Sequence, residues 1–518
     1  MSEPTTSPQV SQTLGGSGLD PDTATVAALR QALTEGTITA GELTAFYLSR
    51  IERLNPVLRA VNSVSPDAAA DAAARDEARA RGTAPGLLDG IPVLIKDNIA
   101  VRGMPATAGS PALAEAEQDE AFLVTRLREA GAVILGKANL SEWANFRSSH
   151  ATSGWSTLGG QAVNPHGPGR NPSGSSSGSG VAVAAGLVPI AVGTETDGSI
   201  VCPASACGIV GIKPTLGLVS RSGIVPISLT QDTAGPMTRS VADAAVLLSV
   251  LAAADPADPA TAAAAVRARD YTTFLDPSAL AGARLGVWRD AVKDAGVRIT
   301  AVLEQALALL REAGAELVDP VELPGAAEVT EPELAALTHE FKHDLNAYLA
   351  GLCGPHPADL AELIKFNMRY ANAVLAPFGQ ELLERAEATT GDLAEPGYRA
   401  ARAEASQRAR EALDGPLAAH RLDAIVTLTA NPAWLTDYAL GDHDIFHTSG
   451  PSAVAGYPAV CVMAGNVSGL PVGLSFLGPA WSEPALIALA YAFEQRAPAR
   501  LVPDLRGHRL AGEPAGQR

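Results

Sequence analysis

The chain of 518 residues is 47% apolar, enough to bury a large core, and its 38 basic against 56 acidic residues give a net charge of −18. That charge repels phosphate backbones and anionic lipid, so it argues against nucleic acid and membranes as partners. Four cysteines without CxxC spacing fit a reduced compartment and predict buried thiols. Residues 1–22 are polar and predict a disordered tail without a signal peptide, so we expect a soluble cytoplasmic protein.

The first part of the chain predicts three helices followed by a buried strand. The helices are expected over residues 23–34, from Thr39 to Asn55-Pro56, and over 66–81, and the second opens with a capping box, Thr39-Ala-Gly-Glu42. The apolar run 93–95 (VLI) then predicts a buried strand that carries Lys96 at its end.

The remaining chain alternates helical and strand patterns, as α/β proteins do. Helices are expected over 119–130, 139–146, 239–253, 298–313, 331–350, 398–413 and 483–496. Strands are expected over 132–135, with a turn at Gly136, and over 209–213, 284–288, 316–319, 423–428, 459–463 and 472–476.

Lys96 is the first candidate for chemistry. The simplest interpretation is a strand-end lysine whose ammonium group reaches water. Its place after three branched apolar residues predicts burial instead, and burial lowers a lysine pKa from about 10.4 toward neutrality. A pKa near 7 would cost about 4 to 5 kcal/mol, so a fold would keep such a lysine for a purpose, and its neutral amine is a base.

A stretch dense in glycine and serine, residues 171–180 (NPSGSSSGSG), leads into the apolar run 181–192 and then into 193–200 (GTETDGSI). A flexible linker would lie between polar segments, so these glycines must bend the backbone inside the fold. The stretch supplies two candidate active-site serines, Ser175 and Ser199. The residues between them can form one helix and one strand and return to the same place, and a lysine is a known alternative to histidine as the base for serine.

Residues 174–178 also match the nucleophile-elbow pattern G-x-S-x-G, with Ser176 at its centre. That elbow needs a β-strand before it, and the prolines at 165, 168 and 172 argue against a central strand there. A phosphate-binding loop is excluded because no Gly-Lys-Ser/Thr closes the stretch.

His339-Glu340-Phe-Lys-His343 matches the HExxH zinc-peptidase motif, with Glu362 placed 19 residues downstream as a third ligand. The predicted helix is amphipathic, so the motif also fits an ordinary solvated helix face, and we expect no metal site. His443 and His447 can supply a base to a serine, although a loop histidine is more often structural or at the rim of a pocket.

Several segments in the same order resemble the amidase signature family from about residue 23 onward. They are 90–98 (GIPVLIKDN), 174–179 (GSSSGS), 193–200 (GTETDGSI), 207–214 (CGIVGIKP), 232–237 (DTAGPM), 456–460 (GYPAV) and 469–474 (GLPVGL). The segments 139–147 (NLSEWANFR), 154–155 (GW) and 228–232 (SLTQD) are particularly similar to bacterial peptide amidases, which remove a C-terminal amide from peptides.

The resemblance implies a Ser-Ser-Lys triad and no cofactor or metal. Lys96 is the implied base, Ser175 the bridging serine in a cis-peptide geometry, and Ser199 the nucleophile. The implied oxyanion hole consists of the backbone N–H groups of Thr196, Asp197, Gly198 and Ser199. Ser149 lies in a loop that resembles a substrate-facing segment, and Ser173-Gly174 replaces the usual Gly-Gly before the first serine.

The implied fold is a single α/β/α domain over residues 23–518, with a mixed, mostly parallel central sheet covered by helices. Asp232 and Arg239 are expected to form a buried ion pair that supports the site. We expect a monomer or a homodimer.

The expected function is a serine amidohydrolase that converts the primary carboxamide of peptides or amino-acid amides into carboxylate and ammonia. One alternative is a component of an amidotransferase complex that generates ammonia for a tRNA-linked substrate, since that machinery contains a member of the family. The other is the zinc peptidase.

Overall fold

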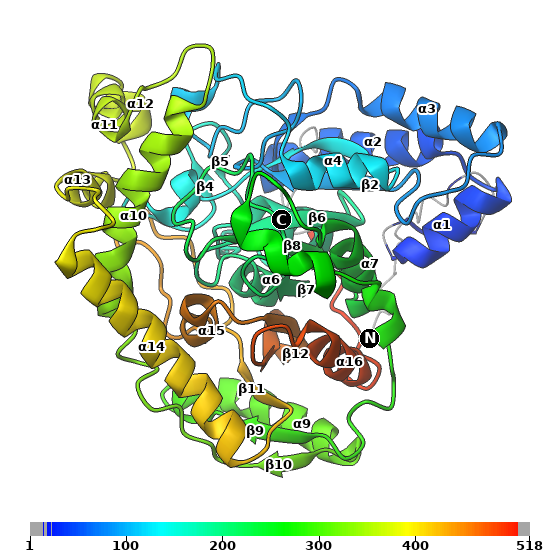
Figure 1. The fold of residues 1–518 in the computed structure, drawn as a ribbon. Helices are drawn as coiled ribbons and strands as arrows, with labels where there is room; N and C mark the ends of the chain where they lie inside the picture. The colour runs from blue at the N-terminus through cyan, green and yellow to red at the C-terminus, as the bar shows by residue number, and fades with distance from the viewer. Residues whose placement is uncertain (1–13, 15–17, 22, 506–518) are drawn as a thin grey trace, which may run out of the picture.

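The computed structural model describes residue 14, residues 18–21 and residues 23–505. Most of the tail expected over residues 1–22 lies outside the described residues. The described chain is built on one eleven-stranded sheet covered by helices (Figure 1). In spatial order the strands are β1 (Val61–Val64), β3 (Val133–Ala138), β2 (Pro92–Lys96), β6 (Ile190–Glu195), β8 (Thr233–Thr238), β7 (Val210–Lys213), β12 (Ala459–Val467), β13 (Leu470–Leu477), β11 (Ala424–Leu428), β9 (Arg284–Val287) and β10 (Glu316–Val318).

The sheet is mixed, as expected, but it is mostly antiparallel. Parallel pairing is confined to β2 with β3 and β6, and to β9 with β10 and β11. The other neighbours pair antiparallel, including the β12–β13 hairpin. A strand that is buried on both faces is an apolar run whether it pairs parallel or antiparallel with its neighbours. The sequence could therefore not distinguish parallel from antiparallel pairing.

For most of the longer helices, both ends lie within a few residues of their expected positions. The C-terminal end of α14 is an exception. The helices are α1 (Val26–Glu35), α2 (Ala40–Leu58), α3 (Ala68–Ala80), α4 (Phe122–Glu129), α5 (Ser177–Ala184), α6 (Val201–Cys207), α7 (Val241–Leu251), α8 (Ala264–Arg267), α9 (Val297–Glu312), α10 (Thr330–Ala350), α11 (Leu360–Arg369), α12 (Ala371–Val374), α13 (Glu381–Glu387), α14 (Pro396–Ala419), α15 (Gly450–Ala455) and α16 (Glu483–Glu494). Thr39 and Glu42 form the expected capping box at the start of α2.

Three local predictions were wrong. Helix α2 continues past Pro56 to Leu58, whose side chain is buried. Strand β3 runs through Gly136, which was expected to form a turn. Residues 139–146 form no regular helix: a 3₁₀ segment spans Glu142–Asn145, and the backbone is left-handed at Trp143.

The thiols and the helices give two further findings. Cys202, Cys207 and Cys461 are buried, as expected, but Cys353 is exposed. Among the described residues, no helix combines the length and the apolar character that crossing a membrane requires.

The site lies where β2 and β6, the third and fourth strands of the sheet, end side by side (Figure 1). The two strands are parallel neighbours, so their carboxyl ends meet at one edge. Strand β2 ends in Lys96, and β6 leads into the turn that carries Ser199. Helix α5, which follows Ser175, is buried at all eight of its residues.

Candidate active site

Lys96 is fully buried, and its amine contacts the first candidate serine. Its Nζ lies 2.8 Å from Ser175 Oγ. Burial lowers the pKa of Lys96 to about 7, against smaller opposing effects of Asp232 and Glu195. The Lys96 amine is therefore available in its uncharged form near neutral pH, in which it can accept a proton.

Thr194, on strand β6, fixes the direction of the lysine amine. Lys96 Nζ donates to the Thr194 hydroxyl at 2.8 Å and to its carbonyl oxygen at 3.1 Å. Asn98 Nδ2 also donates to the Thr194 hydroxyl, at 3.0 Å. These contacts leave the amine little freedom to turn away from Ser175.

The two serine-bearing turns are tied together by the backbone. The peptide bond between Gly174 and Ser175 is cis, and the backbone N–H of Ser176 donates to the carbonyl oxygen of Ser199 at 3.1 Å. The Ser176 hydroxyl donates to the Thr194 carbonyl at 3.0 Å. Ser176, the centre of the elbow-like motif, is thus buried between β6 and the start of α5.

Ser173 occupies the place where the family pattern has a glycine. Its φ is +61°, in the left-handed region that favours glycine. The preference for glycine at this position thus has a backbone cause, and here serine adopts the same conformation. Its N–H donates to Asn171 Oδ1 at 2.7 Å, which helps to hold it.

A cavity of about 250 Å³ opens in front of Ser199. Ser199 lines it and is 7% exposed, whereas Lys96 and Ser175 are fully buried and do not line it. Apolar side chains form part of the wall, and polar and acidic ones form the rest. The lining residues include Phe146, Ile227, Leu337, Trp434, Asp197, Asp442, Asp444 and His447.

The turn from Thr196 to Ser199 contributes all four of its residues to the cavity wall. Within the described chain, the N–H groups of Asp197, Gly198 and Ser199 make no hydrogen bond to another group. Gly198 has a φ of +73°, and a Cβ there would meet Cys202 Sγ and Ser449 Oγ at 2.9 Å. This position therefore requires glycine, and the turn presents unpaired donors beside a serine hydroxyl.

The Amidase family model matches residues 42–487. The chain belongs to the amidase signature family. It is an amide-hydrolysing enzyme.

Individual relatives agree with this assignment over most of the chain. The solved peptide amidase of Stenotrophomonas maltophilia is 50% identical with a TM-score of 0.89, covering 93% of this chain and 99% of its own. A probable amidase of Arabidopsis thaliana is 40% identical, over 91% of this chain and 90% of its own. A Glutamyl-tRNA(Gln) amidotransferase component of Chloroflexus aurantiacus is 37% identical, and the match covers 91% of this chain and 96% of that protein.

The structure differs from two expectations of the sequence analysis. Ser149 is exposed outside the cavity lining, and its N–H and hydroxyl both donate to Glu381, at 2.7 and 3.0 Å. Asp232 and Arg239 form no ion pair, because β8 separates them. Asp232 accepts from Thr196 and from the N–H groups of residues 227 and 228, whereas Arg239 donates to backbone carbonyls, including that of Ala24.

The two candidate histidines differ in position. His447 lines the cavity and lies 2.6 Å from Asp444. Burial alone would lower the pKa of His447, but the Asp444 carboxylate outweighs it and raises the pKa to about 9. His447 is therefore charged at neutral pH and a poor base. His443 is exposed against Asp437 and does not line the cavity.

The HExxH residues of α10 are engaged in separate contacts. Glu340 is fully buried, forms an ion pair with Arg402, and accepts from Tyr398 and Ser228. His339 faces Ala335 O, and His343 faces Asp344. No group of three metal-ligating side chains occurs among the described residues, and Glu340 works here as a structural anion.

Several residues of the site were missed in the sequence. Asn98 and Thr194 orient Lys96, and Trp434 lines the cavity. Asp442 accepts from the N–H and hydroxyl of Ser153, at 2.9 and 2.5 Å, and from Trp434 Nε1 at 3.2 Å. Asn98 and Thr194 lie in the segments 90–98 and 193–200, which resemble the family, and could have been identified there. No motif in the sequence around Trp434 or Asp442 indicated a role for these two residues.

Proposed function

We propose that this amidase is a serine amidohydrolase that cleaves a primary carboxamide, the C-terminal amide of peptides or amino-acid amides, through an acyl-enzyme on Ser199. Lys96 acts as the base and Ser175 as the bridge. The observation that carries this proposal is the fully buried Lys96 amine, with its pKa lowered by burial to about 7, at 2.8 Å from Ser175 Oγ.

The hydrogen bonds of Lys96 fit a neutral amine. A neutral amine has two hydrogens and one lone pair, and Nζ has three close oxygen partners. In the proposed neutral form, the two hydrogens are donated to the hydroxyl and carbonyl oxygens of Thr194, and the lone pair faces the hydroxyl of Ser175. Ser175 can then donate its proton to Lys96 while it accepts one from Ser199.

The reaction follows from this relay. Ser199 Oγ attacks the amide carbonyl carbon as its proton passes through Ser175 to Lys96. The relay then reverses and protonates the nitrogen that leaves as ammonia, and Ser199 holds the acyl group as an ester. Water attacks that ester with the same base and releases the carboxylate, which restores Ser199.

The turn before Ser199 is suited to stabilise the tetrahedral intermediate. The free N–H groups of Asp197, Gly198 and Ser199, with that of Thr196, form the proposed oxyanion hole. One such donor contributes about 3 kcal/mol to the transition state in comparable sites. Because Gly198 has no side chain, the backbone can approach the substrate oxygen closely.

The substrate class rests on similarity as well as on geometry. The structurally similar peptide amidase of Stenotrophomonas maltophilia is 50% identical, compared with 37% for the amidotransferase component of Chloroflexus aurantiacus. The cavity wall includes Phe146, Ile227 and Leu337, which suits an apolar acyl portion. We further propose a cytoplasmic enzyme, monomeric or homodimeric, that uses no nucleic acid partner.

The proposal is tested by measuring ammonia released from N-acetylated dipeptide amides by the purified chain. Ser199→Ala should lose all turnover, at least 10⁴-fold in kcat, because the nucleophile is gone. Ser179→Ala is the matched control: its hydroxyl donates to the Val192 carbonyl at 3.2 Å inside α5, away from the cavity. Retained activity in Ser199→Ala would reject the assignment.

A further inference from the structure

The cavity in front of Ser199 carries an excess of negative charge. Three acidic side chains line it, Asp197, Asp442 and Asp444, and the only cationic group among its lining residues is His447, paired with Asp444. Lys96 lies behind Ser175 and is outside the lining. A substrate in this cavity therefore meets carboxyl groups without a lysine or arginine to offset them.

Asp197 differs from the other two acidic side chains of the cavity in its hydrogen bonding. Its Oδ1 is buried and has no hydrogen-bond partner among the described residues. Asp442, by contrast, accepts several hydrogen bonds, and Asp444 has His447. Asp197 also stands two positions before the proposed nucleophile, within the turn that presents the free N–H groups.

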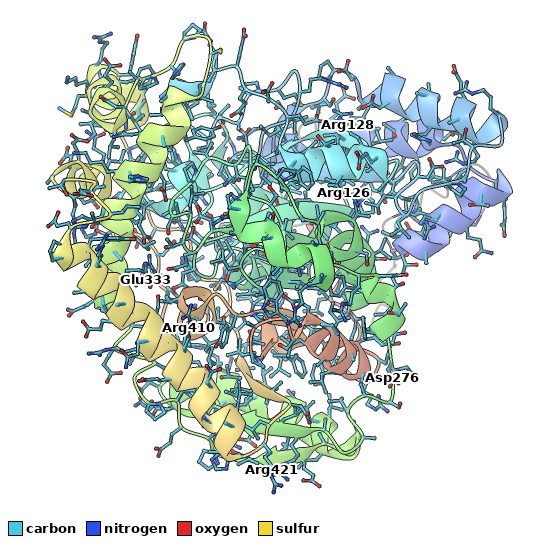
Figure 2. All side chains as sticks on the ribbon, viewed as in Figure 1. Arg126, Arg128, Asp276, Glu333, Arg410 and Arg421 are labelled. Carbon is cyan, nitrogen blue, oxygen red and sulfur yellow. The ribbon has the colours of Figure 1, made fainter. Side chains whose placement is uncertain are left out.

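The charge of Asp197 affects groups around it. Burial is the main reason why the pKa of Glu333 rises to about 8, and repulsion from Asp197 is the next. Glu333, which Figure 2 labels at the start of α10, accepts from Gln231 Nε2, which also donates to the Thr196 carbonyl at 2.9 Å. The cations whose charges interact with that of Asp197 are Lys213 and His447, and of the two only His447 lines the cavity.

Several arginines of the chain lie outside the cavity. Arg126 and Arg128 on α4 and Arg410 on α14 lie on outer helices (Figure 2). The buried Arg147 is paired with Glu142, and Arg402 with Glu340. None of these five side chains lines the cavity.

An oxyanion hole beside a carboxylate oxygen that has no hydrogen-bond partner creates a specific difference between substrate and product. Free N–H groups that stabilise a transient oxyanion would also hold the stable carboxylate that hydrolysis produces. A negative charge on a side chain of the same turn opposes that binding, whereas it acts only weakly on a neutral carboxamide.

We propose that the carboxylate of Asp197, with a smaller contribution from Asp444, makes the cavity distinguish substrates by the charge of the group to be cleaved. The cavity binds an uncharged carboxamide and repels a carboxylate. The product acid and peptides with a free C-terminus are therefore excluded. This inference rests on the proposed function, because it takes the substrate to be a C-terminal amide. It assigns to the Asp197 side chain a role in specificity, separate from the role of its backbone N–H.

Binding is measured by calorimetry on the Ser199→Ala variant, with an N-acetylated dipeptide amide and the same dipeptide as free acid. The acid should bind at least tenfold more weakly than the amide. Adding Asp197→Asn, which keeps size and backbone, should narrow that gap about tenfold, and Asp444→Asn should narrow it less. Adding Asp294→Asn, an exposed residue outside the cavity, makes the same change in net charge and should leave the gap unchanged.

The outcomes separate this inference from the proposed function. Equal affinity for acid and amide, or a gap that neither Asp197→Asn nor Asp444→Asn narrows, overturns the charge selection. The binding measurement uses the Ser199→Ala variant and requires no catalysis. Its result is therefore independent of whether the unmutated chain releases ammonia. Absence of ammonia release from every peptide amide would instead reject the proposed function.

Discussion

In the proposed mechanism, the chemistry of this amidase depends on one buried lysine. An amine removed from water favours its neutral form, and here burial lowers the pKa of Lys96 from 10.5 to about 7. A shift of that size corresponds to roughly 5 kcal/mol between the two protonation states. The fold tolerates it where Thr194 and Ser175 satisfy the amine.

The pH dependence of kcat/KM should report this lysine. The base acts when neutral, so activity should be high above the folded pKa and fall as pH drops through about 7, by tenfold per unit below it. The measurement is a profile of kcat/KM from pH 5 to 9 on a peptide amide. Lys96→Ala should lose at least 10³-fold near neutrality, with partial recovery at high pH.

His447 provides the control for that profile. Its pKa is raised to about 9 through Asp444, so it titrates well above the limb assigned to Lys96. His447→Gln should leave the limb near pH 7 in place. If His447→Gln removes that limb, or if the profile of the unmutated chain is flat down to pH 5, Lys96 is not the base.

The sequence predicted Lys96, Ser175 and Ser199 because each has a local sign: an apolar run before a lysine, or serines between glycines. The same reasoning did not find Trp434 or Asp442, which reach the cavity only through the three-dimensional path of the chain. The predicted ion pair of Asp232 and Arg239 was wrong because strand β8 lies between the two residues. Residues at opposite ends of a strand are separated by the length of that strand.

At the scale of elements, helix α5 holds the first serine turn against the rest of the fold. Gly178 lies in its first turn, and its N–H donates to Asn139 O at 2.9 Å. A Cβ at Gly178 would stand 2.3 Å from Ala60 O and 2.4 Å from Asn139 O. Both are backbone atoms, which cannot turn aside as a side chain can.

Gly178→Ala should therefore push α5 away from its neighbours, destabilise the protein by about 1 to 3 kcal/mol, and lower kcat because Ser175 shifts with the helix. Gly397→Ala is the matched control. Gly397 is exposed in the first turn of α14, and its Cβ would meet only a Glu395 carboxylate oxygen at 3.8 Å. Denaturant midpoints and kcat of the two variants are compared. Equal effects of both substitutions would contradict the packing argument.

Element type and position were largely predictable, and strand direction was not. Amphipathic periodicity and capping residues located α1, α2 and α9 to within a few residues. Strand β8 was missed, because Gly235 and Pro236 within it are depleted from strands in general. The sequence of a short apolar strand does not indicate which strands lie beside it or in which direction they run. The antiparallel part of the sheet therefore became evident only in the structure.

At the scale of the whole molecule, the cavity is assembled from segments far apart in the chain. The end of β6 supplies the nucleophile turn, α10 supplies Leu337, and the loop between β11 and α15 supplies Trp434, Asp442 and His447. Figure 1 shows α10 and α14 along one side of the sheet, away from α1 to α3. Distant segments of one chain thus form the cavity around Ser199.

Because segments of one chain form the cavity around Ser199, the isolated protein should hydrolyse peptide amides without a partner, and added tRNA should change neither the rate nor the affinity for the substrate. The net charge of −18 opposes RNA binding in the same way. The measurement is ammonia release with and without tRNA at low salt. Turnover that appears only with charged tRNA and a partner protein would favour the amidotransferase alternative.

The central claim is that Ser199 carries the acyl group, and mass spectrometry of the trapped intermediate tests it most directly. A slowly hydrolysed N-acetylated peptide ester is mixed with the enzyme, quenched in acid and digested. The account predicts the mass of the acyl group on the peptide that contains Ser199, and no adduct in Ser199→Ala. An acyl group on another residue, or hydrolysis that continues in Ser199→Ala, would contradict it.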